Sequence, residues 1–360
     1  YEDIKTFNPE IVGIYLNVVT ARSGIEISRK IKENTQMKVV LGGPFVPEKL
    51  DRLLDKSKAD IFVQGEAEVT FLEICQGRKK EEINGIIYKE KNKLMVTKPR
   101  ELIANIDELP FPAYHLLPKL SSYSSRSRRK PIAPIFTSRG CPYKCIFCSS
   151  SSVKSPFKNR FRVRSPENVV REIEYLIKSF GVKEIDVLDD NFTLDMKRAN
   201  DILDLIIARK LKVAINLQNG VRADRLTFDL VKKMKQAGVY KAGIGIESGN
   251  QEILRSIKKQ LNLDAVRNAV KWFREVGIVS MGFFMIGFPE DTEETIKQTI
   301  DFAVELNPSL ANFMTAVPLP NTELYDMVEK KGWLKKKTDE TGTESGFYAA
   351  DFHYETPHLT

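Results

Sequence analysis

The chain has 360 residues, a formal net charge of +8 and a hydrophobic content of 42%. This length suits about two globular domains, and the mixture of charged and apolar residues is that of a folded globular protein. No apolar run reaches the roughly 18 residues that a membrane-spanning helix needs, so we expect no transmembrane segment. Four cysteines, three of them clustered, argue against a disulfide scaffold and predict a reducing, anaerobic cytoplasmic location.

Part of the positive charge lies in two short runs, Arg126–Lys130 and Lys335–Lys337. Such runs occur in solvated linkers and also on surfaces that bind polyanions. No nucleic-acid-binding motif accompanies them. We therefore expect solvated linkers and no nucleic-acid partner.

Residues 1–97 alternate between strand and helix patterns, which predicts a Rossmann-like α/β domain with a parallel sheet and crossover connections. The expected helices are Ser23–Glu33, capped by Ser23, then Pro47–Lys56 and Val69–Gln76. The expected strands are Ile11–Leu16, Lys38–Leu41 and Ile61–Val63, followed by a hairpin of Ile86–Tyr88 and Leu94–Val96.

Glycines lie at the carboxyl ends of two of these strands. Gly42 and Gly43 end the second strand, and Gly65 and Glu66 follow the third. Glycines at the carboxyl end of a strand let a large ligand approach the backbone. An ordinary tight turn would use the same residues.

Residues 98–130 contain four prolines and predict a linker, and residues 336–360 form a C-terminal extension. Between them, residues 131–335 repeat a strand and a helix six times, which predicts a partial (βα)6 TIM-like barrel. The expected strands are Ile132–Thr137, Glu184–Leu188, Lys212–Leu217, Lys241–Ile246, Ser280–Ile286 and Asn312–Ala316. The expected helices are Pro166–Ser179, Met196–Ala208, Thr227–Ala237, Asp264–Val276, Thr292–Leu306 and Thr322–Lys331.

The first barrel strand leads into a loop with three cysteines, Cys141, Cys145 and Cys148, spaced Cys-x3-Cys-x2-Cys. A structural zinc site takes four Cys or His ligands, and no His lies near this loop. An iron–sulfur cubane held at three corners would keep one iron open for a small chelating molecule. The alternatives are a zinc site with a distant fourth ligand and three unconnected thiols.

This loop resembles the signature of the radical S-adenosylmethionine (SAM) superfamily, in which an aromatic residue often precedes the last cysteine, as Phe147 does here. The resemblance extends over about residues 131–335. It implies a [4Fe-4S] cluster on the three cysteines, with SAM chelating the open iron. It also implies reductive cleavage of SAM to a 5′-deoxyadenosyl radical, with an electron donor such as flavodoxin or ferredoxin.

Functional residues of a barrel lie at the carboxyl ends of its strands. Under the resemblance, the predicted SAM contacts are Phe147, Asp190, Asn191, Arg222, Glu247, Ser248 and Gly287. Some of these residues could have an ordinary structural role instead. Asp190 and Asn191 could cap a helix, Arg222 could form a surface salt bridge, and Gly287 could belong to a core strand.

The first half resembles the cobalamin-binding domain that precedes many radical SAM barrels, through the Ile11–Leu16 strand, the Gly42-Gly43-Pro44 turn and Gln64–Glu68. The family's Asp-x-His-x-x-Gly segment is missing, since no His precedes His115. We expect an N-terminally incomplete domain that either binds cobalamin without a protein His ligand or is vestigial. The cobalamin contacts that the resemblance implies are Gly42, Gly43, Gly65 and Glu66.

Together these resemblances imply a cobalamin-dependent radical SAM enzyme that methylates an unactivated carbon of a small-molecule or peptide substrate. No catalytic residue is identified. One alternative is a radical SAM enzyme with a vestigial cobalamin domain that cyclises or rearranges its substrate. The other is a non-enzymatic iron–sulfur sensor or nucleic-acid-binding protein. A methylthiotransferase is excluded because a second cluster needs three more cysteines, and only Cys75 remains.

Overall fold

The computed structural model describes residues 2–45, 50–123, 128–151, 160–335 and 353–359. The start of the predicted helix Pro47–Lys56, part of each basic run and most of the predicted 336–360 extension lie outside these residues. Within the described ranges, no helix is long and apolar enough to cross a bilayer. The chain divides into two compact units. The first comprises residues 1–103, 147–158 and 317–355, and the second 104–146, 159–316 and 356–360.

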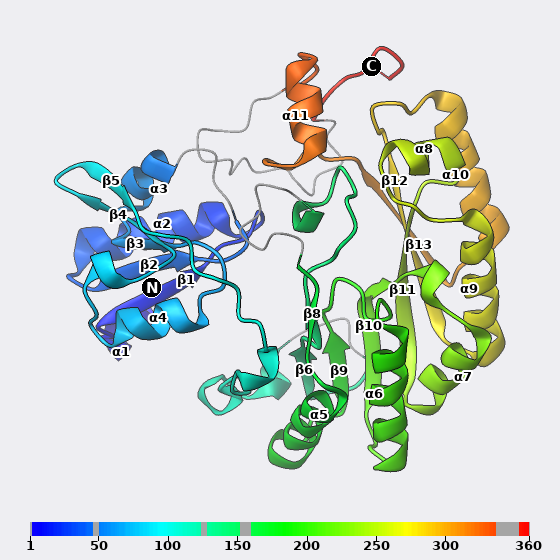
Figure 1. The fold of residues 1–360 in the computed structure, drawn as a ribbon, viewed down its shortest axis with the longest axis horizontal. Helices are drawn as coiled ribbons and strands as arrows, with labels where there is room; N and C mark the ends of the chain where they lie inside the picture. The colour runs from blue at the N-terminus through cyan, green and yellow to red at the C-terminus, as the bar shows by residue number, and fades with distance from the viewer. Residues whose placement is uncertain (1, 46–49, 124–127, 152–159, 336–352, 360) are drawn as a thin grey trace. The chain divides into compact units, whose positions relative to one another are not determined.

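The first unit contains a five-stranded sheet in the order β1-β2-β3-β4-β5 (Figure 1). The first three strands are parallel, and the last two form an antiparallel hairpin. The predicted strands and hairpin are thereby confirmed. The strands are β1 (Ile11–Tyr15), β2 (Lys38–Gly42), β3 (Ile61–Val63), β4 (Ile86–Glu90) and β5 (Lys93–Val96).

Two apolar clusters cover this sheet. Val39 and Leu41 of β2 belong to one cluster, with residues of α2 and α3, and Val40 belongs to the other, with Ile74 of α4. Adjacent strand residues point to opposite faces, so a buried parallel strand needs an apolar residue at every position. The helices are α1 (Glu2–Phe7), α2 (Ala21–Asn34), α3 (Leu50–Ser57) and α4 (Glu68–Cys75).

The second helix begins earlier than predicted, and Ser23 is not its cap. The side-chain oxygen of Asn17 accepts hydrogen bonds from the backbone N–H groups of Val19 and Thr20, both at 2.9 Å. This turn starts the helix at Ala21. The preceding α1 was not predicted, because six residues are too few to display a helical period.

The second unit contains six strands in the order β13-β12-β11-β10-β9-β6, all parallel, so strands that are neighbours in the sheet follow one another along the chain. This confirms the predicted α/β fold of the partial (βα)6 TIM-like barrel, with one crossover helix or helix pair between successive strands. The strands are β6 (Ile132–Ile135), β9 (Glu184–Val187), β10 (Ala214–Val221), β11 (Val239–Glu247), β12 (Val279–Ile286) and β13 (Leu310–Thr315).

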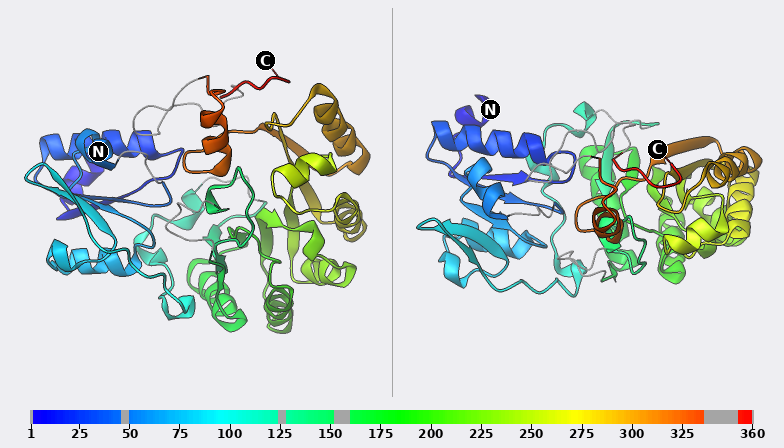
Figure 2. Two further views of the ribbon diagram at one scale, coloured as in Figure 1. Left: turned by 45° about the horizontal axis from the view of Figure 1, so that its top comes forward. Right: turned by 90° about the horizontal axis from the view of Figure 1, so that it is seen from above.

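The long helices of this unit lie along one face of the sheet (Figures 1 and 2). The hydroxyl of Ser165 caps the first of them, with Pro166 in the first turn, as predicted. Gly277 ends α9 in a left-handed conformation. The helices are α5 (Pro166–Phe180), α6 (Met196–Ala208), α7 (Phe228–Gln236), α8 (Gln251–Ser256), α9 (Leu263–Val276) and α10 (Glu293–Leu306). The last predicted helix is α11 (Glu323–Lys330), which by its contacts groups with the first unit.

One strand is longer than predicted. β10 does not end at Leu217 but continues to Val221, with a slip in its pairing with β11 between these two residues. Gly220 takes a φ of 116° there, and a Cβ on it would lie 3.0 Å from the backbone oxygen of Gly243. Arg222 therefore directly follows the end of the strand.

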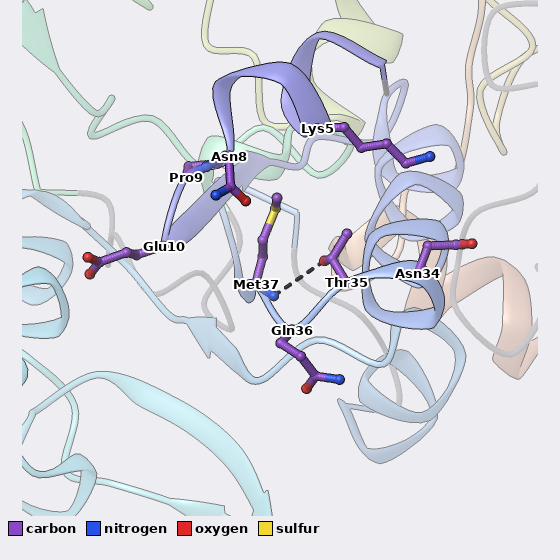
Figure 3. Close-up of a pocket in the computed structure, with 8 residues that line it drawn as sticks. All are labelled: Lys5, Asn8, Pro9, Glu10, Asn34, Thr35, Gln36 and Met37. Carbon is purple, nitrogen blue, oxygen red and sulfur yellow. Dashed lines mark hydrogen bonds between the residues drawn. The ribbon is translucent and has the colours of Figure 1, made fainter.

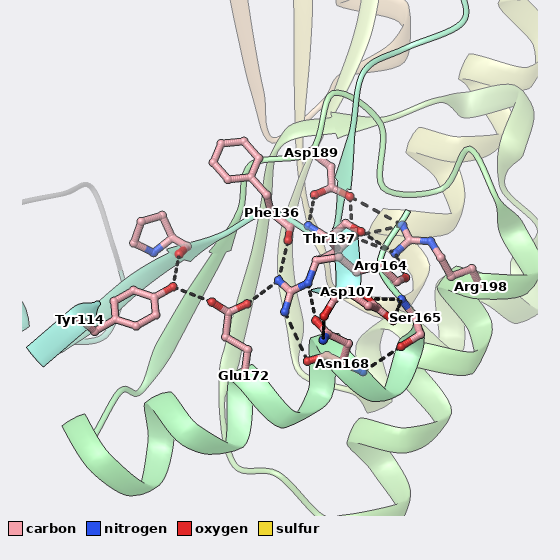
Figure 4. Close-up of polar contacts among 11 residues, drawn as sticks. Asp107, Tyr114, Phe136, Thr137, Arg164, Ser165, Asn168, Glu172, Asp189 and Arg198 are labelled. Atoms are coloured by element: carbon pink, nitrogen blue, oxygen red, sulfur yellow. Dashed lines mark hydrogen bonds and ion pairs between the residues drawn. The ribbon is translucent and has the colours of Figure 1, made fainter. Parts of the chain in front are cut away.

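From residue 104 onward, part of the predicted linker packs on the barrel (Figure 4). The Asp107 carboxylate accepts a hydrogen bond from the backbone N–H of Ser165 at 2.9 Å. The hydroxyl of Tyr114 donates to Glu172 of α5 at 2.9 Å. These contacts tie much of the predicted 98–130 linker to the first barrel helix.

Candidate functional site

The cysteine loop lies between two short antiparallel strands, β7 (Ser138–Arg139) and β8 (Arg162–Val163). Gly140 follows with a φ of 80°, and a Cβ on it would lie 2.4 Å from the backbone oxygen of Arg160. Only glycine fits this turn. Cys145 is buried and Cys141 and Cys148 are partly buried. Cys148 and Phe147 fall after the unit boundary and belong to the first unit.

A buried carboxylate fixes the chain just before the loop. Asp189, which is 1% exposed, accepts hydrogen bonds from the backbone N–H of Thr137 and the hydroxyl of Ser138, both at 2.6 Å. Arg198 lies 3.7 Å from the same carboxylate and donates to the backbone oxygen of Thr137 at 3.1 Å (Figure 4). Asp189 therefore holds the end of β6 to the end of β9.

The two residues predicted for SAM after β9 differ in their surroundings. Asp190 is exposed, whereas Asn191 is 3% exposed. The side-chain oxygen of Asn191 accepts from the backbone N–H of Thr193 at 3.2 Å, and its amide Nδ2 has no hydrogen-bond partner among the described residues. A buried donor without a partner is rare in native proteins. A ligand with an acceptor group would satisfy it.

A turn between α8 and α9 supports the cysteine loop from the barrel side. The backbone N–H of Ile146 donates to the backbone oxygen of Ile257 at 3.1 Å. The sulfur of Cys145 lies 3.8 Å from the backbone oxygen of Lys258. Two independent contacts thus hold the centre of the loop.

Arg222 braces this turn from the other side. Its guanidinium donates to the backbone oxygens of Lys259 at 3.1 Å and Gln260 at 2.7 Å. It also pairs with Asp224 through two bonds of 2.9 and 3.1 Å and lies 3.7 Å from the ring centre of Tyr143. These partners occupy Arg222, so its geometry supports a structural role, and contact with SAM stays a prediction.

Glu247 ends β11 in a left-handed backbone conformation, with a φ of 68°. The residue is 6% exposed, and its carboxylate accepts a hydrogen bond from Nζ of Lys259 at 2.6 Å. Burial alone would lower the pKa of Lys259, but the charges of Glu247 and Cys145 outweigh it, and the pKa is raised. Lys259 therefore stays a cation paired with Glu247.

The next two predicted residues lie at the same edge of the sheet. Ser248 is 1% exposed, and its hydroxyl bonds to that of Thr299 on α10 at 3.1 Å. Gly287 has a φ of 83° and open space where a Cβ would point. The Asp291 carboxylate accepts from the backbone N–H of Gly287 at 2.9 Å, which shapes the loop after β12. Ser248 thus holds two elements together, and Gly287 borders free space.

The donor set suits a multi-iron cluster better than a single ion. Within the described ranges, no three His, Cys, Asp or Glu side chains converge where one metal ion could sit. Each cysteine of a cluster binds its own iron, so the thiolates need only surround it. Three thiols on one loop, with the Arg222 guanidinium stacked on Tyr143 of the same loop, fit an anionic cluster.

The residues predicted for cobalamin lie at the carboxyl edge of the first unit's sheet. Gly43 has a φ of 126°, and a Cβ on it would lie 2.3 Å from the backbone oxygen of Leu16. Glycine is therefore needed there for the protein's own packing. A Cβ on Gly42 would lie 3.4 Å from the Cβ of Val63, and Gly65 has a φ of 89°. The Glu66 carboxylate accepts from the backbone N–H of Ile103 at 3.2 Å.

A hollow of about 630 Å³ lies at the opposite edge of the same sheet (Figure 3). Glu10 and Met37 directly precede β1 and β2, so it lies at the amino ends of the strands. Ligands of open α/β sheets bind at the carboxyl ends. This hollow is therefore separate from the predicted cobalamin edge. Its lining residues are Lys5, Asn8, Pro9, Glu10, Asn34, Thr35, Gln36 and Met37.

Sequence inspection missed Asp189, Arg198 and Lys259. Asp189 directly precedes the predicted Asp190. The sequence shows two adjacent carboxylates but does not show which of them is buried. Lys259 follows a helix too short to be recognised, and its partner is 12 residues away. Each of the three directly adjoins a residue of like charge, so no local pattern distinguishes it.

Comparisons with known proteins agree with this geometry. The model of the radical SAM superfamily matches residues 135–303. Uncharacterized methyltransferase PH0819 of Pyrococcus horikoshii is 38% identical over 90% of this chain and 70% of its own length. Cytidylyl-2-hydroxyethylphosphonate methyltransferase of Streptomyces wedmorensis is 26% identical over 92% of this chain and 68% of its own length.

A solved structure shares the fold. TsrM of Kitasatospora setae, a radical SAM methyltransferase with cobalamin and a [4Fe-4S] cluster bound, superposes with a TM-score of 0.73 at 20% identity. The match covers 90% of this chain and 65% of TsrM, so the chain spans about two thirds of that protein. From the family model, the PH0819 relationship and the braced cysteine loop, we conclude that the chain belongs to the radical SAM superfamily.

Proposed function

We propose that the protein is a cobalamin-dependent radical SAM methyltransferase that acts on an unactivated carbon. The observation that carries this proposal is the 38% identity to a protein named as a methyltransferase, over 90% of the chain. The fold shared with TsrM, whose structure holds cobalamin and a [4Fe-4S] cluster, supports both cofactors. A small-molecule or peptide substrate, a reducing cytoplasm without oxygen, and a flavodoxin or ferredoxin donor belong to the same proposal.

The three thiolates of Cys141, Cys145 and Cys148 would hold the cluster, and Asn191 and Glu247 would contact SAM. Gly42, Gly65 and Glu66 would border cobalamin at the sheet edge. When bound, the cluster and SAM supply a 5′-deoxyadenosyl radical and cobalamin supplies the methyl group. The chain itself orients the reagents, and close confinement lowers the entropic cost of their meeting.

The test uses protein purified without oxygen and reconstituted with iron, sulfide and hydroxocobalamin. Reduced protein with SAM should form 5′-deoxyadenosine, and candidate metabolites incubated with methyl-labelled SAM should gain the label. Formation of 5′-deoxyadenosine with no retained cobalamin would favour the cyclising alternative. Failure to form any four-iron cluster would contradict the whole proposal.

A further inference from the structure

A polar cluster on the sheet of the second unit takes no part in the contacts described above. Asp186 of β9 and Asn216 of β10 lie opposite each other in the parallel pairing of these strands. Nδ2 of Asn216 donates to Oδ1 of Asp186 at 2.7 Å and to Oε1 of Gln218 at 3.3 Å. One amide group therefore joins a carboxylate and a second amide.

The long helices of this unit lie along one face of the sheet, and the cluster lies on the other (Figure 2). Side chains alternate between the two faces of a strand. Asp186 is only partly buried and Gln218 is exposed. Their apolar neighbours in sequence are buried, as the helix-covered face requires, and these are Ile185, Val187, Ile215 and Leu217. A ligand can therefore reach the cluster from the side without helices.

Asn216 has a hydrogen-bond acceptor that the protein does not satisfy. The residue is 2% exposed, and its Oδ1 has no hydrogen-bond partner among the described residues. Both partners of its Nδ2 are oxygens, which fixes the orientation of the amide, so the unpartnered atom is the oxygen. Buried polar atoms are nearly always hydrogen-bonded. A ligand that donates an N–H group would supply the missing partner.

The carboxylate of Asp186 favours a donor that is positively charged. Burial raises the pKa of Asp186 above its usual value. The hydrogen bond from Asn216 lowers this pKa, the Glu184 carboxylate raises it and the charge of Lys241 lowers it, and the net shift is upward. The protein thus stabilises the ionised carboxylate incompletely. A bound cation would supply the remaining stabilisation.

Apolar side chains continue the same face across β12 and β13. Asn216 is level with Lys241 of β11, and Gly243, two residues further on, pairs with Met281 of β12. Residues two apart on a strand point the same way, so Met281 shares the face of Asn216. A Cβ on Gly243 would lie 2.7 Å from the ring of Phe283, so this glycine lets the ring lie against β11.

Two more methionines extend this apolar surface. Met285 of β12 is partly buried, and its partner Met314 of β13 is 40% exposed. Methionine side chains adapt to the shape of what they contact and pack favourably on aromatic rings. The face therefore presents acceptors at one side and a deformable apolar surface at the other.

We propose that Asp186 and Asn216 are specificity-determining residues that bind an amine group of the substrate, whose apolar part rests on Phe283 and the adjoining methionines. This inference rests on the proposed function and names its substrate class, a small apolar molecule that carries an amine. The Asp186 carboxylate accepts from the ammonium and balances its charge. Oδ1 of Asn216 accepts a second N–H after the small side-chain shifts that commonly accompany binding. The pair orients the substrate, and no bond forms or breaks there.

The probe is phenethylamine, which joins an ammonium group to an apolar ring, and the reference is methyl phenethyl ether, which has no donor. Protein with isotope-labelled methionine methyl groups is titrated with each compound and followed by NMR. The amine should shift the signals of Met281 and Met285. The ether should bind at least about tenfold more weakly, because a charge-assisted hydrogen bond is lost. Unshifted signals with the amine, or equal binding of the two compounds, would overturn the inference.

Asp186→Asn removes the charge and keeps the shape, and burial already favours the neutral form there, so the fold should accept it. The variant should lose the preference for the amine over the ether. Asp201→Asn is the matched control, because it makes the same charge change on α6, where Asp201 pairs with Lys197 at the surface. Its preference should equal that of the parent. If Asp186→Asn fails to fold, Asn216→Leu tests the same point, since it removes the second acceptor. An unchanged preference in the folded variant would overturn the inference.

The two proposals fail in different ways. A parent protein that forms 5′-deoxyadenosine from SAM but does not bind the amine would overturn this inference and leave the proposed function standing. A parent protein that binds the amine but forms no four-iron cluster would overturn the proposed function and leave an amine-binding site.

Discussion

The guanidinium of Arg222 lies 3.7 Å from the ring centre of Tyr143, within the cysteine loop. This stacking couples the end of β10 to the loop that follows β6. The same guanidinium reaches the backbone oxygens of Lys259 and Gln260, between β11 and β12. One side chain therefore fixes three segments that are far apart in the sequence.

Replacing Arg222 by Met should lower the free energy of unfolding by about 3 kcal/mol, because the buried guanidinium loses its charge-assisted hydrogen bonds and its stacking on Tyr143. Urea denaturation monitored by fluorescence measures this. Arg255→Met is the control, since Arg255 pairs with Glu252 on the surface and exposed pairs contribute little. Equal losses in the two variants would show that Arg222 is not a brace.

Replacing Cys145 by Ala should abolish the four-iron absorption after reconstitution and stop formation of 5′-deoxyadenosine. The cluster would lose one of three ligands. Iron and sulfide analysis provides the measurement. Cys75→Ala is the matched control, because Cys75 is exposed on α4 and should be dispensable. Full iron content in Cys145→Ala would refute the ligand assignment.

Two adjacent carboxylates provide a sharp comparison. Asp189→Asn should destabilise the protein by about 3 kcal/mol, because its buried carboxylate accepts from Thr137 and Ser138 and faces Arg198. Asp190→Asn should leave thermal stability unchanged, since Asp190 is exposed. If Asp190 contacts SAM as predicted, Asp190→Asn should also weaken SAM binding, which isothermal titration calorimetry measures.

Replacing Gly43 by Ala should cost more than about 3 kcal/mol, because the new Cβ would lie 2.3 Å from the backbone oxygen of Leu16 at a φ of 126°. Gly77→Ala is the control. Gly77 also has a positive φ, 72°, but it faces open space, so its cost should be about 1 kcal/mol. Thermal unfolding of both variants measures the difference. Similar losses would mean that Gly43 is not tightly packed.

Asp291 predicts a pH effect on stability. Burial raises the pKa of its carboxyl above the usual value, despite hydrogen bonds from Thr295 and from the backbone of Phe288 and Gly287. The folded state therefore binds this proton more tightly than the unfolded state does. The stabilisation is full below the unfolded-state pKa of about 3.9 and is lost as pH rises through the folded-state value. Asp291→Asn should flatten this part of the stability profile, as measured by urea titrations from pH 4 to 7.

The sequence predicted the alternation of strands and helices well because its signals are local. Met196–Ala208 was predicted with the observed bounds. The cysteine spacing also led to the superfamily. Periodicity, caps and turn residues act within a few positions of one another, so they can be recognised in a single chain.

The site's supporting contacts were not predictable in the same way. Arg222 was expected to face SAM, but its partners include backbone oxygens 37 and 38 residues away. Asp189 and Asp190 look alike in the sequence, although only one is buried. Such distinctions depend on how distant strands align, which no local pattern encodes.

The contact between Cys145 and Lys258 joins positions 113 residues apart. A nascent chain that has just emerged as far as the cysteines still lacks the turn that supports them. The strands of this sheet follow one another along the chain, so β11 and α8 must leave the ribosome before this contact can form. A cluster on these cysteines would therefore gain the support of this turn only after most of the barrel has been made.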